Sequence, residues 1–233
     1  MCKPATRLLL ILTVIFSICG SNAFAQFLDP RVTAFAGASF LKGERAFIID
    51  GDAFQSRFQN GGKIGVRLTA DLTDSWSLEG TYSFSGTDLR ITELDEVPPE
   101  ERYFGVGVHQ FVFNGLYYLT PPGGKLRFFL TAGIGWVRFS PSDTAKILAL
   151  VDDFINGTAS LRSSNKFGFN FGAGMETRAN EWLGLRVDIR DHITGHPRFG
   201  LPKTSSVPGS VYFPVDGILH NTEVSAGVVF YLP

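Results

Sequence analysis

The chain has 233 residues, of which 21 are Lys or Arg and 22 are Asp or Glu, giving a formal net charge of −1. This balance lacks the basic excess by which proteins hold nucleic acid, so no nucleic-acid partner is expected. Hydrophobic residues make up 44% of the chain. Beyond residue 25 they are spread over short segments, none near the ~20 apolar residues of a membrane-spanning helix.

The first 25 residues are predicted to be a secretory signal peptide. Lys3 and Arg7 precede an apolar run over residues 8–19, and an Ala-Phe-Ala sequence of the A-x-A cleavage type ends at Ala25. Cleavage after Ala25 leaves residues 26–233 as one mature domain. Removing two of the 21 basic residues leaves 19 against 22 acidic ones.

Both cysteines, Cys2 and Cys19, lie in this leading segment. The mature domain therefore has no disulfide framework, and its stability must come from hydrogen bonding and burial. A lipoprotein anchored at Cys19 is an alternative, but residues 16–18 (Phe-Ser-Ile) lack the small residue expected before a lipidated cysteine.

Segments of about ten residues that alternate in polarity follow one another along the rest of the chain. Between Gly62 and Leu72 every even position is apolar, and every odd position is charged or small. Period two places the two sets on opposite faces of a strand. Eight strands are predicted on this pattern, at residues 31–40, 62–72, 76–85, 103–119, 126–136, 166–177, 183–190 and 223–232.

Two of these segments alternate less regularly. Residues 31–40 carry small side chains on both faces. Residues 103–119 change parity near His109 and Gln110, which indicates either a β-bulge or a strand that extends beyond the membrane.

The connections alternate between short and long. Residues 73–75, 120–124 and 178–181 form short turns, whereas residues 41–60, 86–102, 140–165 and 193–219 form long links. This alternation is typical of an up-and-down barrel with periplasmic turns, extracellular loops and periplasmic termini. One long link is expected to hold a helix over residues 144–155, capped by Ser142 or Asp143 and followed by Gly157.

The predicted fold is therefore an all-β, eight-stranded, antiparallel, up-and-down transmembrane β-barrel with its polar face inside. A lumen of eight strands is just wide enough to be filled by side chains. Five basic and five acidic residues take the inward parity, and they are expected to pair because an unpaired charge there is costly. They are Lys63, Arg67, Asp71, Glu79, Arg127, Glu176, Arg186, Asp188, Arg190 and Glu223.

Aromatic residues lie near the predicted strand ends, where a membrane protein places its interfacial girdles. They are Trp76, Tyr82, Phe84, Tyr117, Tyr118, Trp136, Phe139, Trp182, Phe230 and Tyr231. A soluble sandwich or soluble barrel also alternates in polarity, but it needs no secretion signal, no uniform ten-residue strands and no aromatic ends.

The order of several segments resembles the small outer-membrane barrel family of the OmpA transmembrane-domain, OmpX and Ail type. The segments are LTADLTDSWSLEGTYSF (68–84), LTAGIGW (130–136), GAGME (172–176), WLGLRVDIRDH (182–192) and HNTEVSAGVVFYL (220–232). The resemblance covers nearly all of the mature chain. It implies a bacterial outer-membrane location and insertion by the barrel-assembly machinery.

The histidines and serines do not form a recognisable reactive motif. His192 and His196 would meet only on a helix, and their region is predicted to be a strand followed by a loop. Ser83 and Ser85 could be combined with His109 as a hydrolase, but no diagnostic motif accompanies them. No catalytic residue, metal or cofactor is therefore expected.

The expected function is non-enzymatic: an integral outer-membrane protein that contributes to envelope structure and presents long extracellular loops. The expected partners are outer-membrane lipid, lipopolysaccharide and an extracellular ligand of the loops. Two alternatives remain open, a narrow porin-like channel and an enzyme that modifies outer-leaflet lipid.

Overall fold

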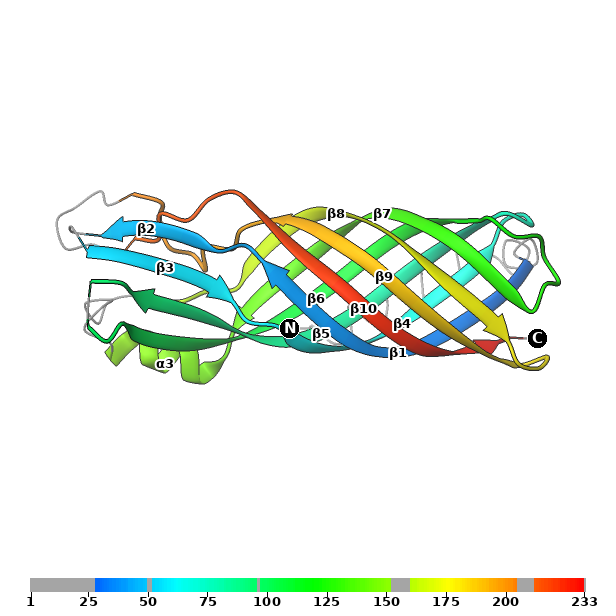
Figure 1. Ribbon diagram of the computed structural model, residues 1–233, viewed down its shortest axis with the longest axis horizontal. Helices are drawn as coiled ribbons and strands as arrows, with labels where there is room; N and C mark the ends of the chain where they lie inside the picture. Colours follow the sequence, from blue (N-terminus) through cyan, green and yellow to red (C-terminus); the bar gives the residue numbers. More distant parts are fainter. Residues whose placement is uncertain (1–27, 50–51, 96, 152–159, 205–211, 233) are drawn as a thin grey trace, which may run out of the picture.

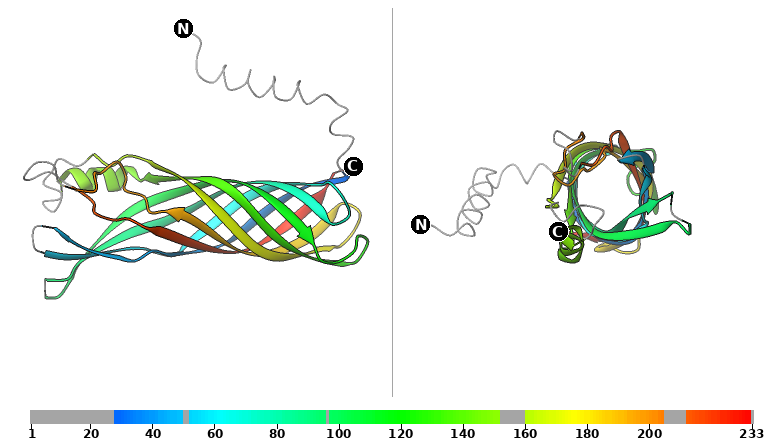
Figure 2. Two further views of the ribbon diagram at one scale, coloured as in Figure 1. Left: turned by 90° about the horizontal axis from the view of Figure 1, so that it is seen from above. Right: turned by 90° about the vertical axis from the view of Figure 1, so that its left-hand side faces the viewer.

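Eight long strands form a closed barrel in the computed structural model, which describes residues 28–49, 52–95, 97–151, 160–204 and 212–232. The strands are β1 (Leu28–Lys42), β4 (Gly61–Asp71), β5 (Trp76–Glu93), β6 (Glu100–Tyr118), β7 (Leu126–Pro141), β8 (Ser164–Arg178), β9 (Leu183–Gly195) and β10 (Ile218–Tyr231). Each pairs antiparallel with its neighbours in the chain order, and β1 pairs with β10 to close the ring seen end-on in Figure 2. The predicted eight-stranded antiparallel barrel is confirmed.

Two of the predicted long links contain additional strand. Residues 41–60 were expected to be loop but include a hairpin of β2 (Arg45–Ile49) and β3 (Asp52–Phe58), and β3 pairs with the outer part of β5. Residues 86–102 lie mostly in β5 and β6, which leaves only residues 94–99 as the connection. Figure 1 shows β2, β3 and α3 at one end of the barrel and the C-terminus at the other. The barrel therefore continues well past the length of an ordinary membrane span.

The parity change near His109 and Gln110 is not a bulge. The β5–β6 register runs without a shift from Glu93 opposite Glu100 to Trp76 opposite Tyr117. What changes is the character of the interior, because buried residues on β6 are apolar in its first part and include polar side chains further on. Of the two explanations, a strand extending beyond the membrane is the one that fits, and the bulge is wrong.

The long link after β7 contains the helix α3 (Asp143–Val151), within the segment predicted to be helical. Its cap is Ser142, whose hydroxyl oxygen accepts a hydrogen bond from the backbone NH of Ala145 at 3.1 Å. The remaining part of the predicted helix and Gly157 lie outside the described residues, as does the predicted signal peptide. In the described part of the chain, no helix has both the length and the apolar character to cross a membrane.

The interior of the barrel is apolar at the end that carries β2, β3 and α3, and we call this region the outer apolar core. Its members come from the barrel strands, the β2–β3 hairpin, α3 and the link between β9 and β10. Its buried side chains are Leu41, Phe47, Phe54, Phe58, Leu89, Ile91, Phe104, Val106, Val108, Val137, Phe139, Ala145, Ala149, Phe199, Phe213, Val215 and Leu219. The described parts of the links thus pack on one another, which orders them as a continuation of the barrel.

One histidine is buried in the outer apolar core. The ring of His196 is 4% exposed and lies 5.6 Å from the ring of Phe58 and 6.4 Å from that of Phe213. Burial lowers the pKa of His196 below its usual 6.5, and the positive charges of Arg45 and Lys166 act in the same direction. The neutral imidazole is therefore the form that fits the folded core.

Acid is expected to loosen the outer apolar core. An unfolded chain binds a proton at His196 near pH 6.5, whereas the folded chain binds it only at lower pH. The contribution of His196 to stability is thus complete above pH 6.5 and is lost as the pH falls toward the folded pKa. Limited proteolysis of the folded protein should be faster at pH 5.5 than at pH 7.5, and His196→Gln should remove this dependence. Equal rates for the wild type at the two pH values would contradict the expectation.

Candidate functional site

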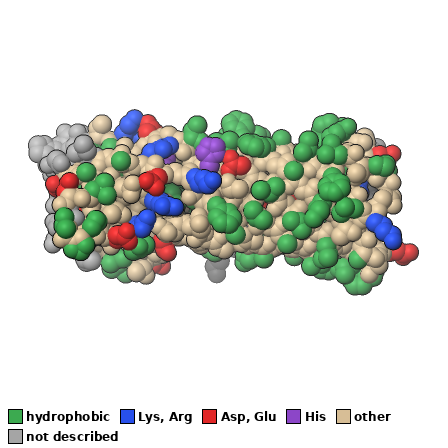
Figure 3. All heavy atoms as spheres, viewed as in Figure 1, with side chains coloured by type: hydrophobic (Ala, Val, Ile, Leu, Met, Phe, Trp, Pro, Cys, Tyr) green, Lys and Arg blue, Asp and Glu red, His purple; other side chains and the backbone are tan. Residues whose placement is uncertain are grey.

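The outward face of the barrel is apolar over most of its length. Outward side chains such as Ile64, Leu68 and Phe113 are more than 60% exposed. On the face drawn in Figure 3, charged side chains gather over the end that carries β2, β3 and α3 and recur at the opposite tip, while hydrophobic side chains predominate between them. A closed sheet with this surface satisfies its backbone internally and presents hydrocarbon to lipid, as a membrane-spanning barrel must.

Seven of the aromatic residues expected in the girdles are on this outward face and exposed. They are Trp76, Tyr82, Phe84, Tyr117, Trp136, Trp182 and Phe230. The other three were placed wrongly, because Tyr118, Phe139 and Tyr231 point inward. All three occupy the inward positions of the alternating pattern in β6, β7 and β10. Period two does not allow chain neighbours to share a face, so Tyr118 beside outward Tyr117 and Tyr231 beside outward Phe230 must point inward.

All ten charged residues expected in the lumen lie there, and nine are buried while Arg127 is partly exposed. They form three groups along the barrel axis. The group nearest the short turns joins Asp71 and Glu176 through Arg31, with nitrogen–oxygen distances of 2.8 and 3.2 Å. Arg31 also donates a hydrogen bond to the hydroxyl of Tyr118, and Arg127 stacks on that ring at 3.6 Å. These contacts link β1, β4, β6 and β8 across the lumen at this end.

The middle group crosses the lumen from β5 to β9. The two carboxylate oxygens of Glu79 lie 2.8 Å from Arg186 and 2.7 Å from Arg190. Asp188 lies between the same two arginines on β9, 3.0 Å from Arg186 and 2.8 Å from Arg190. The amide of Asn114 also donates to Glu79 at 3.2 Å. Each carboxylate is therefore held by at least two guanidinium groups, which the low-dielectric interior requires of buried charges.

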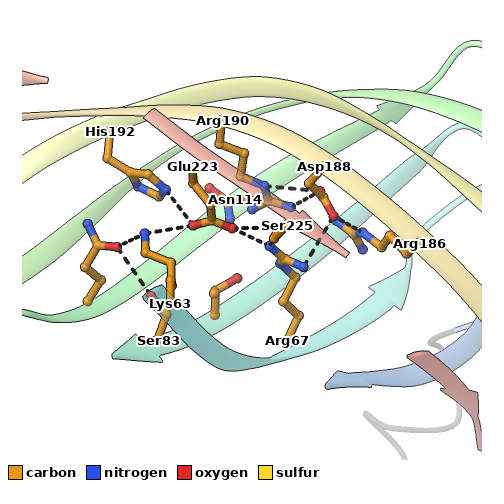
Figure 4. Close-up of polar contacts among 12 residues, drawn as sticks. Lys63, Arg67, Ser83, Asn114, Arg186, Asp188, Arg190, His192, Glu223 and Ser225 are labelled. Carbon is orange, nitrogen blue, oxygen red and sulfur yellow. Dashed lines mark hydrogen bonds and ion pairs between the residues drawn. The ribbon is translucent and has the colours of Figure 1, made fainter. Parts of the chain in front are cut away.

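The third group lies nearest the outer apolar core, and Figure 4 shows it beside the middle one. Glu223 accepts from Lys63 at 2.9 Å and from Arg67 at 2.7 Å, and the ring of His192 lies 3.3 Å away. Arg67 links this group to the middle one, since its other terminal nitrogen is 3.3 Å from Asp188. Lys63 also donates to Gln110 at 2.6 Å. The second and third groups thus form one continuous network.

A glycine makes room for the central arginine. The guanidinium of Arg67 stacks on the ring of Phe35 at 3.6 Å. A Cβ atom at Gly65 would come within 2.6 Å of the same ring, closer than a side chain allows. The small residue at this inward position therefore lets Phe35 and Arg67 fill the lumen together.

Some members of the lumen network were not predicted. Arg31 lies in the strand whose alternation is weak, so its inward parity was not recognised, and it makes the lumen six basic to five acidic residues. Tyr118 was assigned to the girdle. Gln110, Asn114 and His192 are uncharged or weakly basic, and only their parity within a strand could have identified them.

The histidines considered as ligands or bases are not brought together, and His220, the fourth histidine of the chain, does not join them either. His192 belongs to the lumen network, His196 to the outer apolar core, and His220 is exposed on the outward face. Ser83 and Ser85 are buried in the lumen, whereas His109 is on the outward face beside Tyr82, so the barrel wall separates them. Among the described residues no group of three or more His, Cys, Asp or Glu side chains is arranged to hold a metal ion.

The barrel wall, its lipid-facing surface and its ionic lumen together define an outer-membrane β-barrel protein. Residues 10–230 match the family model described as outer membrane protein beta-barrel domain, so the chain belongs to that family. No curated protein sequence matches the chain.

Solved structures are similar to this chain at low sequence identity, and the first of them shares its fold. The outer membrane protein OprG of Pseudomonas aeruginosa is 10% identical with a TM-score of 0.56, over 89% of this chain and 97% of that one. The Neisserial surface protein NspA is 12% identical with a TM-score of 0.49, over 87% and 97%. The N-terminal β-barrel domain of Pseudomonas aeruginosa OprF is 16% identical with a TM-score of 0.45, over 88% and 97%.

Breaking the middle group should destabilise the barrel strongly. Glu79→Gln removes the negative charge between Arg186 and Arg190 while keeping the size of the side chain. We expect the free energy of unfolding to fall by about 3 kcal/mol or more, the cost of leaving buried charges without a partner. Urea unfolding in phospholipid vesicles measures it.

Lys203→Gln is the matched control, because it breaks the pair of Lys203 with Asp216 at 2.7 Å, in which both side chains are more than half exposed. Little change is expected there, since water already screens the pair. Equal effects of Glu79→Gln and Lys203→Gln would show that the lumen network does not stabilise the fold.

Proposed function

We propose that this protein is a non-enzymatic, non-conducting outer-membrane barrel that contributes to envelope structure. The observation that carries the proposal is the filling of the lumen. The side chains of Arg67, Glu79 and Arg186 are buried in the lumen and ion-paired across it, Glu79 with Arg186 at 2.8 Å and Arg67 with Asp188 at 3.3 Å. A conducting pore needs a continuous water path, and rings of charge around such a path stay hydrated.

The outer end supports the second part of the proposal, a structure presented at the cell surface. The outer apolar core joins β2, β3 and α3 to the barrel, so the described part of the extracellular end is a packed body. A rigid body of this kind offers a preformed surface to an extracellular ligand at low entropic cost. Export through a cleaved signal peptide and insertion by the barrel-assembly machinery complete the proposal.

The second candidate function is a narrow channel, and it differs from the first in its conductance. In planar bilayers the purified wild type should give no stepwise conductance. The triple variant Arg67→Ser, Glu79→Ser and Arg190→Ser removes three lumen-filling side chains that contact one another or Asp188, and it should open a water path. Stepwise conductance of the wild type comparable to that of the variant would contradict the proposal. Migration that shifts on boiling in SDS electrophoresis would show in both that the barrel is folded.

A further inference from the structure

A cluster of polar side chains lies on the outward face of β9 and β10, away from the lumen network. Nδ1 of His220 is 2.7 Å from one carboxylate oxygen of Asp191, and the hydroxyl of Thr222 donates to the other at 3.2 Å. Lys42 on β1 is exposed directly across from His220. We call Asp191, His220 and Thr222 the wall cluster.

The charged residue of the wall cluster, Asp191, lies among apolar side chains on the outward face. Outward neighbours of Asp191 are Ile189 and Ile193 on its own strand and Phe171 opposite it on β8. Thr222, paired with Asp191, lies ten residues along the chain from Leu232, the exposed residue that follows β10. At ~3.4 Å per residue and a tilt near 40°, this is about 26 Å, the height of a barrel's apolar band. The cluster therefore lies at the headgroup level of the outer leaflet.

An apolar groove adjoins the wall cluster. It has a volume of about 520 Å³ and is lined on the lipid side by Leu130, Phe171, Ala173 and Ile189, with Asp191 and Thr222 at its polar end. The small side chain of Ala173, between Leu130 and Ile189 in the sheet, leaves the hollow between larger neighbours. A groove in a lipid-facing wall is filled by an acyl chain, because lipid is the only apolar solvent present there.

We propose that the groove and the wall cluster form a binding site for one glycolipid of the outer leaflet. An acyl chain occupies the groove, and the sugar headgroup meets the wall cluster. A carboxylate has about four acceptor sites, and Asp191 uses two of them within the cluster, so it can still accept from sugar hydroxyls. Lys42 supplies donors on the headgroup side, and Nε2 of the neutral His220 ring can accept, because its Nδ1–H is donated to Asp191. The carboxylate favours a headgroup that presents several sugar hydroxyls over phosphatidylglycerol, whose small headgroup has few hydroxyls beside its anionic phosphate.

This inference rests on the proposed lipid-facing function of the wall, but not on whether the lumen conducts. The test is native mass spectrometry of protein released from nanodiscs of phosphatidylcholine that contain lipid A or phosphatidylglycerol. We expect the wild type to retain one lipid A molecule in preference to either phospholipid. Asp191→Leu should weaken retention about tenfold or more, since it removes the charge-assisted hydrogen bonds while restoring an apolar outward face that suits folding.

A second variant tests the groove separately. Ala173→Phe fills the hollow and should weaken lipid A retention to a similar degree. Two controls alter the outward face elsewhere: His109→Gln changes a polar side chain beside Tyr82, and Ala36→Phe enlarges an alanine on β1. Both should retain lipid A as the wild type does. Retention that is unaffected by Asp191→Leu and Ala173→Phe, or a preference for phosphatidylglycerol, would overturn the inference, and boiling-dependent migration confirms folding for each variant.

Discussion

The rest of the structure depends on a carboxylate held between guanidinium groups across the lumen. Glu79 on β5 contacts Arg186 and Arg190 on β9, two strands that are not neighbours in the sheet. Hydrogen bonds between adjacent strands close the wall, but they do not determine what occupies its interior. With eight strands there is space only for side chains, and charged ones must satisfy each other there. The same contacts that stabilise the barrel therefore also fill its lumen with side chains.

The interior of the barrel changes along its axis from ionic to apolar, and each part matches what surrounds the barrel at that level. Where lipid covers the outside, the inside is ionic, and polarity is inverted relative to a soluble protein. Where the strands continue past the apolar band, the inside becomes the outer apolar core and charged residues move to the outer surface. This second part follows the rule for soluble domains. The wall cluster lies near the level at which the two arrangements meet.

Much of this could be predicted because period two leaves few choices. Once Ile64, Val66 and Leu68 are assigned to the lipid-facing side, Lys63 and Arg67 must point inward. Tyr118 was assigned to the wrong face because parity was not applied to it, although it adjoins outward Tyr117. Arg31 was missed because it begins a predicted strand whose two faces both carry small residues, so the pattern does not distinguish them. The hairpin of β2 and β3 was missed because its apolar residues serve a core assembled from distant links. The pairing of the charges could not be predicted either, because partners such as Glu79 and Arg190 are 111 residues apart in the sequence.

The central claim is that the lumen charges act as one coupled network across the barrel. A double-mutant cycle of Glu79→Gln and Arg190→Met, followed by urea unfolding in phospholipid vesicles, tests it most directly. Side chains in direct contact in one network couple by about 0.5–3 kcal/mol, and we expect at least 1 kcal/mol for this pair. Additive effects of the two substitutions, within about 0.3 kcal/mol, would contradict the claim.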